Sequence, residues 1–245
     1  MSMIKKLFII TSSLLLGGIS ILQAQNNIDA LHGDRINRKQ GLHNGNLVET
    51  LFWNFGEVGW WGKQPSGVWP KGTNHSYMDG IYPLVAAEVQ LEDGRITHIV
   101  EGGYREHYEE GSTGMEFGWQ PLSGFANPDQ DYIALSDDPN TWPLYWPDQA
   151  ADWGGSWNGY FGRKTNADQE SYFVMDDYQD YGQDFWGLFN SDSLDPNRGG
   201  LGMRVAVRGF QWSNVLAEDI IFWHYDITNV STTTYAKTVF GMYAD

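Results

Sequence analysis

The sequence predicts a mainly-β protein, an antiparallel β-sandwich-like domain with long loops rich in Gly, Pro and Trp. The first observation is a side-chain period of two, with β-branched and aromatic residues, over residues 201–245. The second is a hairpin pattern over residues 82–100 around the turn signal Glu92-Asp93-Gly94. The third is that no stretch after residue 24 keeps a helical period for more than a turn or two. Short strands separated by Gly, Pro and Asp turns favour a sandwich.

Residues 201–245 carry the clearest strand pattern. Side chains alternate over residues 203–208 and again over residues 220–227, and after a polar break the chain runs extended over residues 235–243. This alternation is typical of strands in an antiparallel sheet, and we treat the stretch as one ladder. The pattern continues almost to Asp245. We therefore expect the sheet to be incomplete as given, and the chain to be an N-terminal fragment of a longer protein.

The first 24 residues have the pattern of a secretory signal peptide. Lys5 and Lys6 precede an apolar or small run, and Ala24 stands just before polar residues. An uncleaved anchor is the alternative, because about 18 apolar residues are enough to span a bilayer. After cleavage we expect a polar leader of residues 25–41, a β-rich domain of residues 42–245 and no membrane span. The lysine-led signal looks bacterial, so the predicted location is extracellular or on the outer cell surface.

Other stretches predict further strands and the loops between them. Residues 47–55 form the first aromatic, strand-like run, and residues 172–175 form another. The segments 56–72 and 127–157 contain repeated Gly and Pro, which exclude a regular helix there. A long ordered loop needs anchors. In the second loop we expect these to be Trp142, Trp146, Trp153 and Trp157.

Charge and cysteine content restrict the function classes. Removal of residues 1–24 takes away two lysines and no acid, which leaves 13 basic and 31 acidic side chains and a net charge of −18. This charge disfavours nucleic acid and anionic membranes as partners. Cysteine is absent, so an exported domain of this kind depends on core burial, with or without help from a metal ion.

Two acidic clusters raise the question of catalysis. They are Asp176, Asp177, Asp180 and Asp184 in one stretch and Glu106, Glu109, Glu110 and Glu116 in another. Paired carboxylates beside tryptophan are what a glycoside hydrolase needs. In so acidic a chain, solvated carboxylates explain the clusters equally well. No zinc, nucleotide-binding or serine-hydrolase motif occurs, and we assign no catalytic residue.

The loop of residues 190–197 is a candidate calcium site. Calcium prefers hard oxygen ligands, and closely spaced Asp and Asn side chains supply them. We name Asp192, Asp195 and Asn197 as the candidate ligands. The EF-hand spacing is not met, and Asp and Asn are also common turn residues, so the turn interpretation stays open. Calcium is the one cofactor that the sequence suggests.

The aromatic content permits two interpretations. Twelve Trp and thirteen Tyr exceed what a core of this size needs, and many lie in Gly/Pro-rich loops. Exposed rings could stack on sugars, because a ring face is an apolar platform with a polar edge. The competing interpretation, which we favour, is that these rings pack inward and fix the long loops.

Several segments together carry one more signal. They are residues 69–72, 136–143, 157–162, 168–171, 174–177, 217–229 and 240–245. In combination they resemble a group of large, mostly uncharacterised secreted proteins of Bacteroidetes-type and Ignavibacteria-type bacteria. The resemblance implies export, often through the type IX secretion system, and chains much longer than this one. It implies no catalytic residues.

These observations converge on a secreted or cell-surface bacterial domain with a structural or adhesive, non-enzymatic role. The alternative is a carbohydrate-binding module or a glycoside-hydrolase-related protein. The expected partners are glycans or other surface proteins.

Overall fold

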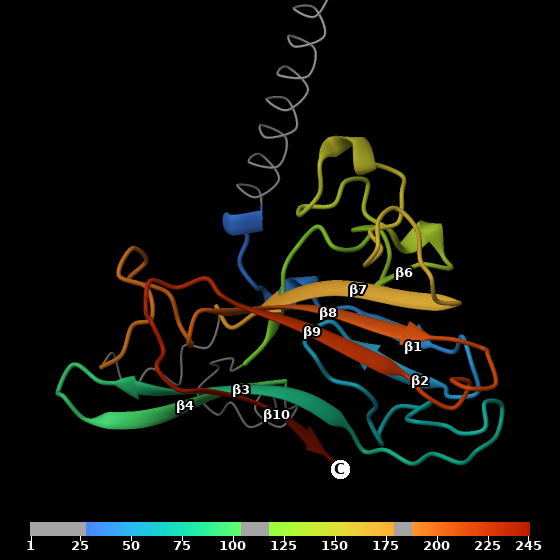
Figure 1. The fold of residues 1–245 in the computed structure, drawn as a ribbon, viewed down its shortest axis with the longest axis horizontal. Coiled ribbons are helices and arrows are strands. Elements are labelled where there is room, and N and C mark those ends of the chain that lie inside the picture. Colours follow the sequence, from blue (N-terminus) through green and yellow to red (C-terminus); the bar gives the residue numbers. More distant parts are fainter. Residues whose placement is uncertain (1–27, 104–117, 179–187) are drawn as a thin grey trace, which may run out of the picture.

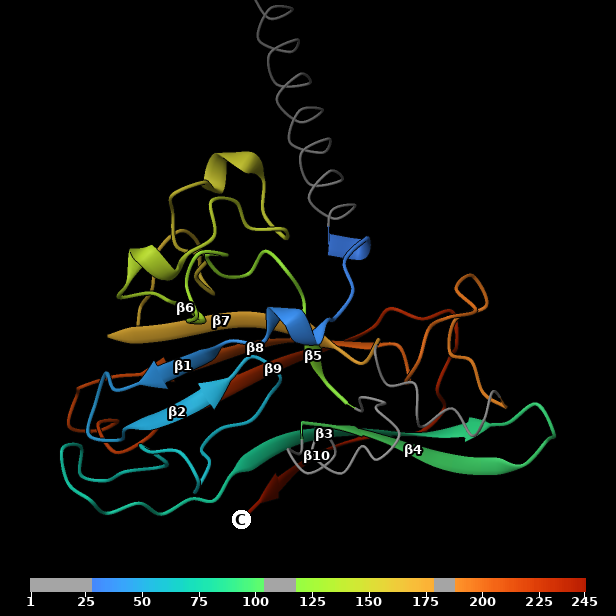
Figure 2. The same cartoon turned by 180° about the vertical axis from the view of Figure 1, so that it is seen from behind.

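The computed structural model describes residues 28–103, 118–178 and 188–245. The fold is mainly β, and its named strands pair antiparallel in two facing layers (Figures 1 and 2). The strands are β1 (Gln40–His43), β2 (Thr50–Trp53), β3 (Ile81–Gln90), β4 (Ile96–Gly102), β5 (Gln120–Pro121), β6 (Ala134–Leu135), β7 (Gln169–Asp176), β8 (Met203–Gln211), β9 (Phe222–Asn229) and β10 (Thr238–Ala244). Short 3-10 turns are η1 (Arg35–Asn37), η2 (Pro139–Thr141) and η3 (Ala151–Trp153). The predicted sandwich-like fold class is confirmed.

The layers are two sheets and a separate strand pair. The first sheet has the order β5-β7-β8-β9, with β6 also paired to β7. The second sheet has the order β10-β3-β4, and β1 pairs with β2. Single bridges through Val58 join β2 to the start of β3. In Figure 1 strands β7, β8 and β9 lie above β3, β4 and β10, and β1 and β2 lie at one end of the sandwich.

The main core lies between the two layers. Phe52 of β2, Val85 of β3 and Ile99 of β4 meet Met175 of β7 and Val205 of β8, and all five are buried. Alternation along each strand places these side chains on the inner face, because successive side chains of a strand point to opposite faces. Burial of each such side chain stabilises the fold by about 1.5–3 kcal/mol.

A second, smaller core lies on the outer face of the first sheet. Tyr172 and Val174 of β7 point outward and pack under Phe125, Trp146 and Trp157 of the long loop region. The rings of Trp146 and Trp157 cross edge-to-face, with centroids 5.6 Å apart. Figure 1 shows this loop region above β7. β7 is consequently buried on both faces along its whole length.

Several predicted elements are confirmed. The hairpin of residues 82–100 is β3 and β4, and its turn contains Gly94 with φ of 87°, a conformation that favours glycine. The run at residues 47–55 contains β2, and the run at residues 172–175 lies within β7. The alternating stretches after residue 201 contain β8, β9 and β10.

The ladder of residues 201–245 divides between the two layers. β8 and β9 pair in the first sheet, whereas β10 pairs with β3 of the second sheet. The connection after β9 carries the chain across the open side of the sandwich, where Tyr235 donates a hydrogen bond to Leu201 O. Across the layers, the rings of Tyr225 and Phe240 lie 5.5 Å apart. The expectation of one ladder is therefore wrong, although each strand is present.

Regular structure also begins earlier than the predicted domain start at residue 42. η1 and the first residues of β1 lie within the predicted leader. Gly33 N donates to the Asp176 carboxylate over 2.8 Å, which ties this segment to the end of β7. Gly41 faces the ring of Phe52 so closely that a Cβ atom there would lie 2.2 Å from Cζ.

Among the described residues, no helix is long and apolar enough to cross a membrane.

Candidate functional site

The outer face of the first sheet has a covered half and an open half. The covered half consists of the outer side chains of β7 and β8 beneath the loop region of residues 122–168. The open half consists of the outer side chains of β9 and the end of β8, where Phe222, His224 and Asp226 are exposed. Both halves belong to one continuous sheet surface, because β8 pairs with β7 on one side and with β9 on the other.

An ion pair between neighbouring strands organises the covered half. Glu170 of β7 and Arg208 of β8 are both buried, and Arg208 Nη1 lies 2.7 Å from Glu170 Oε1. The guanidinium lies over the ring of Tyr172, 3.7 Å from its centroid. Trp157 Nε1 donates to the other carboxylate oxygen over 2.9 Å. A buried charge without such partners would be strongly unfavourable, so these contacts fix the geometry of all four side chains.

A tight turn stands at the boundary between the two halves. Gly159 and Gly162 exchange backbone hydrogen bonds, which leaves Tyr160 and Phe161 as the two central residues. Gly162 has φ of 120°, and a Cβ atom at Gly159 would lie 2.4 Å from a backbone oxygen, so both positions need glycine. The turn presents its two rings to solvent, with Tyr160 51% and Phe161 77% exposed.

The buried ion pair also holds this turn in place. Arg208 Nη1 donates to Asn158 O over 2.6 Å, immediately before the turn. Glu170 Oε1 accepts a hydrogen bond from Tyr160 N over 3.2 Å. The turn is therefore tied to β7 and β8 through charged groups, whose hydrogen bonds are stronger than those of neutral partners.

The turn and the open half enclose an aromatic groove. Its aromatic side chains come from the turn, the end of β8 and the start of β9: Tyr160, Phe161, Phe210, Trp212 and His224. Phe222 packs edge-to-face against Trp212. The groove has a volume of about 250 Å³. The rings of Phe210 and Trp212 are nearly parallel, with centroids 5.8 Å apart, and the Tyr160 ring meets His224 at 5.1 Å.

Polar groups border the groove. Lys164, Asn166 and the buried Glu170 are among the residues that line it. Trp212 Nε1 donates to Asn166 O over 2.9 Å, which fixes the indole. A small number of hydrogen-bonding groups beside aromatic ring faces suits a ligand that has apolar faces and polar edges.

A half-buried acid of the loop region itself, Asp148, belongs to the same polar network. Asp148 accepts hydrogen bonds from Tyr172 Oη at 2.6 Å and from Asn158 Nδ2 at 2.9 Å. Burial raises the pKa of Asp148, and the hydrogen bond from Tyr172 opposes that rise. Burial, together with the nearby Asp148 charge, raises the pKa of Tyr172 well above its usual value. Tyr172 therefore keeps its proton and serves as the donor.

The candidate calcium ligands lie in a loop built from side chain-to-backbone turns. Asp192 Oδ1 accepts from Leu194 N over 2.9 Å, and Asp195 Oδ1 accepts from Asn197 N over 3.0 Å. The other Asp195 oxygen accepts from Tyr178 Oη over 3.0 Å. Within the described parts of the chain, no three His, Cys, Asp or Glu side chains come together as metal ligands. The calcium site stays a prediction.

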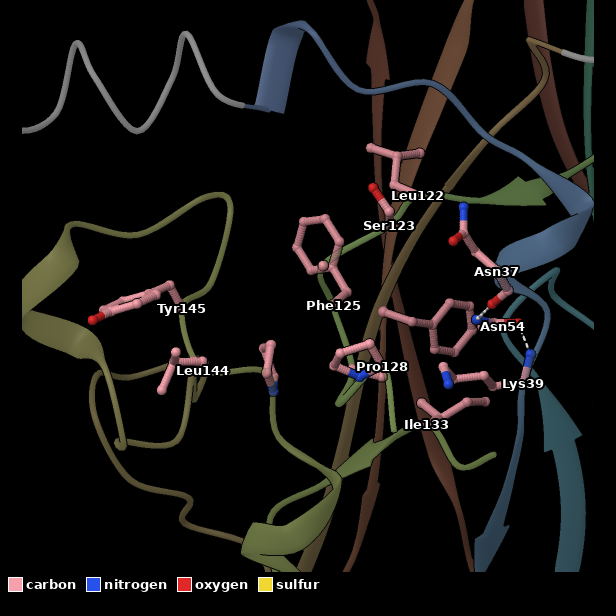
Figure 3. Close-up of a pocket in the computed structure, with 14 residues that line it drawn as sticks. Asn37, Lys39, Asn54, Leu122, Ser123, Phe125, Pro128, Ile133, Leu144 and Tyr145 are labelled. Atoms are coloured by element: carbon pink, nitrogen blue, oxygen red, sulfur yellow. Dashed lines mark hydrogen bonds between the residues drawn. The ribbon is translucent and has the colours of Figure 1, made fainter. Parts of the chain in front are cut away.

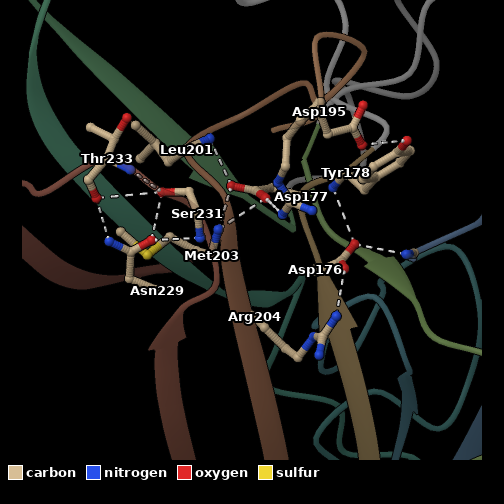
Figure 4. Close-up of polar contacts among 12 residues, drawn as sticks. Asp176, Asp177, Tyr178, Asp195, Leu201, Met203, Arg204, Asn229, Ser231 and Thr233 are labelled. Atoms are coloured by element: carbon tan, nitrogen blue, oxygen red, sulfur yellow. Dashed lines mark hydrogen bonds and ion pairs between the residues drawn. The ribbon is translucent and has the colours of Figure 1, made fainter. Parts of the chain in front are cut away.

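Of the two acidic clusters, only the first pair lies in the described chain. Asp177 accepts from Arg198 Nη2 at 2.7 Å and from Leu201 N at 2.8 Å, and the neighbouring Asp176 accepts from Gly33 N (Figure 4). Burial raises the pKa of Asp176, while the Arg198 charge opposes that rise. These carboxylates tie backbone segments together. The acids that lie outside the described residues are Asp180, Asp184, Glu106, Glu109, Glu110 and Glu116.

A second pocket, of about 350 Å³, lies between the loop region and the start of β1 (Figure 3). Its walls are mostly apolar, with Phe125 and Tyr145 among them. Its amide groups are already engaged: Asn54 accepts from Lys39 N over 2.8 Å and donates to Asn37 O over 2.9 Å. These contacts hold the N-terminal segment against β2, so the aromatic groove is the better candidate for a ligand site.

The tryptophans of the long loop behave as predicted anchors. Trp146 and Trp157 are buried, and Trp142 and Trp153 pack against the same cluster. The groove instead uses Trp212 and rings outside the Trp-rich loops, which sequence reasoning did not select. One signal was present, since the alternation over β8 places Phe210 on the face opposite to the core residues.

Comparisons with models of protein families, with curated proteins and with solved structures find no match to the chain.

Proposed function

We propose that the chain is a secreted or cell-surface bacterial protein with a non-enzymatic, adhesive role, and that it binds glycans in the aromatic groove. One observation carries the proposal: Tyr160 and Phe161 stand on a rigid turn and are half or more exposed beside Trp212. Large aromatic rings are unfavourable when they are exposed to water. A rigid turn that holds two of them outward therefore favours a binding role over a packing role. The lysine-led, apolar N-terminus and the acidic composition support export and a surface location.

Sugar rings match this groove chemically. The C–H faces of a pyranose pack on aromatic ring faces, and its hydroxyl groups need nearby donors and acceptors. Lys164, Asn166 and His224 supply such groups along the groove. Neutral or cationic glycans suit the chain better than polyanions, because the net charge is strongly negative.

The groove favours binding over hydrolysis. A retaining glycoside hydrolase uses two carboxyl groups about 5 Å apart, and an inverting enzyme uses two that are farther apart. Among the described residues that line the groove, Glu170 is the sole carboxylate. Arg208, Trp157 and the backbone of Tyr160 already occupy its oxygens.

A glycan array with the purified full-length chain tests the proposal, followed by titration calorimetry on the best glycan. We expect Phe161→Ala to weaken binding about tenfold, which corresponds to the loss of one ring stack of about 1.4 kcal/mol. Trp61→Ala is the matched control, because Trp61 is 65% exposed but lies outside the groove. We expect both variants to keep the Tm of the original protein, and the bound glycan to be recovered uncleaved.

The proposal fails if the full-length chain retains no glycan, or if Trp61→Ala weakens binding as much as Phe161→Ala. Recovery of a shortened glycan would support the hydrolase alternative.

A further inference from the structure

β10 forms the outer edge of the second sheet. Its pairing with β3 is complete, and no other strand of the described chain pairs with its opposite side. Lys237 O accepts from Glu88 N, and Asp245 exchanges hydrogen bonds with Gly80, so odd-numbered residues direct their amide groups toward β3. In an antiparallel ladder the alternate residues then direct theirs outward. These outward residues are Thr238, Phe240, Met242 and Ala244.

The same strand leaves apolar side chains of the core face uncovered. Phe240 lies opposite Val85, a core residue, and Met242 is two positions farther along the same face. Phe240 nevertheless remains 47% exposed and Met242 42% exposed. A pocket of about 380 Å³ opens beside Phe240, lined in part by Ile227 and Tyr235. An edge with free amide groups and exposed apolar side chains is a ready template for another strand.

The sequence of this edge is complementary to itself. Residues 237–245 are centred on Gly241, with Lys237 at one end and Asp245 at the other. If a second copy runs antiparallel about Gly241, each Lys237 lies opposite the Asp245 of the other copy. Each Phe240 then lies opposite a Met242, and sulfur–aromatic contacts of this kind are favourable.

We propose that two copies of this chain associate by antiparallel pairing of their β10 strands about a two-fold axis at Gly241. The interface is isologous, with the same surface on both copies, as in most homodimers. It lies on the second sheet, away from the aromatic groove, and does not depend on the proposed glycan binding.

The backbone positions agree with this register. Phe240 and Met242 both direct their amide groups outward, so their pairing falls at hydrogen-bonded positions of the new ladder. Gly241 falls at a non-hydrogen-bonded position, where Cα atoms approach to about 4.5 Å. A Cβ atom at Gly241 would have no atom within 4 Å, so no side chain of the same copy covers the sheet face at this position.

Charge complementarity selects a second copy over an unrelated strand. Lys237 is 71% exposed although it contacts Glu88 at 2.9 Å, so its ammonium group remains accessible to a second carboxylate. An unrelated strand would have to carry an acid and a base at the same spacing. Repulsion between two acidic chains is reduced at physiological salt, where charges farther apart than about 8 Å are screened.

Sedimentation equilibrium of the purified full-length chain in 0.15 M salt tests the proposal. We expect a reversible monomer–dimer equilibrium with a Kd in the micromolar range, as is typical of a small interface. Met242→Pro removes an outward N–H but none of the hydrogen bonds to β3, and we expect it to weaken dimerisation at least tenfold. Because proline can also disturb the fold, a second set of variants changes only exposed charges.

In that set, Lys237→Glu or Asp245→Lys places like charges opposite each other, and either should weaken the dimer about tenfold. The double variant Lys237→Glu/Asp245→Lys should recover dimerisation, because opposite charges again face each other. Lys237→Glu and the double variant both lose the contact of residue 237 with Glu88, so loss of that contact cannot explain a difference between them. A chain that stays monomeric up to 200 µM, a hundredfold above about 2 µM, overturns the proposal. So does a dimer that neither Met242→Pro nor the single charge variants weaken, or a double variant that recovers nothing.

Discussion

The covered and open halves of the first sheet's outer face carry similar aromatic side chains, which are buried in the covered half and lie at the surface in the open half. In the covered half, Tyr172 and Trp157 pack with a buried Glu170–Arg208 pair under a long loop region. In the open half, Phe222 and Trp212 stay at the surface. The two halves share β8, and the aromatic composition is similar on both sides. What separates them is whether a loop covers the rings.

The covered half supports the open half. Arg208 and Glu170 bind the backbone on either side of Gly159, so the wall of the groove is fixed from beneath. Aromatic side chains under the loop act as anchors, whereas those beyond it are free to contact a ligand. Substitutions in the covered half should therefore affect both stability and binding, and those in the open half should affect binding with little loss of stability.

The largest effect is expected for Arg208→Ala. The substitution leaves Glu170 buried without its charged partner, which costs about 3–5 kcal/mol in unfolding free energy. Urea unfolding followed by tryptophan fluorescence measures the loss. Arg163→Ala is the control, since its pair with Asp152 is exposed and should contribute at most about 1 kcal/mol. Equal losses for the two variants would show that the covered half has no special role.

An effect of about 3 kcal/mol is expected from pH, on the inner face of the same strands. His43 is fully buried and contacts Ser171 Oγ at 2.9 Å, and a Cβ atom at Gly209 would lie 2.4 Å from its Nε2. Burial lowers the pKa of His43 from 6.5 to about 4. The unfolded chain then binds more protons between these values, so stability present above pH 6.5 is lost as the pH falls toward 4. The shift corresponds to about 3 kcal/mol.

Urea unfolding at pH 7 and at pH 4.5 measures this dependence against His43→Gln, which cannot titrate in that range. Carboxylates also titrate there, so the informative quantity is the difference between the two proteins. A pH dependence of the same size in His43→Gln would contradict the assignment.

A smaller effect, about 2 kcal/mol, is expected for Trp157→Phe. The ring can still pack, but the donor to Glu170 Oε2 is lost, and hydrogen bonds to charged groups contribute about 1.5–3 kcal/mol. Trp212→Phe is matched to it at the open half, where the lost bond goes to Asn166 O near solvent. Its expected cost is below about 1 kcal/mol. Reversal of this order in urea unfolding would remove the distinction between the halves.

The strands could be predicted because their signal is local. β3, β4, β7, β8 and β9 all show a period of two or a turn signal within a few residues. β1 lacks such a signal. Its extended conformation depends on pairing with β2 and on the contact of Gly41 with Phe52, and its own composition does not predict a strand. The place of β10 depends on Phe240 pairing with Val85, far earlier in the chain, and no local pattern reveals such a partner.

The candidate site was less accessible to sequence reasoning for the same reason. Its rings come from a turn, the end of β8 and the start of β9, and only the fold brings Tyr160 within 5.1 Å of His224. The covering role of the loop tryptophans was predictable, because a long ordered loop needs buried anchors. Glu170 and Arg208 looked like ordinary members of an acidic and an alternating stretch.

The tether between the Tyr160–Phe161 turn and the buried ion pair has a thermodynamic consequence. A wall that is set during folding loses little conformational entropy when a ligand arrives, so most of the contact energy remains available as affinity. If the wall were loose, ordering each side chain would cost about 0.5–1.5 kcal/mol on binding. The folding of β7 and β8 therefore prepares the groove in advance, and the charged contacts at Asn158 and Tyr160 are the link between the two.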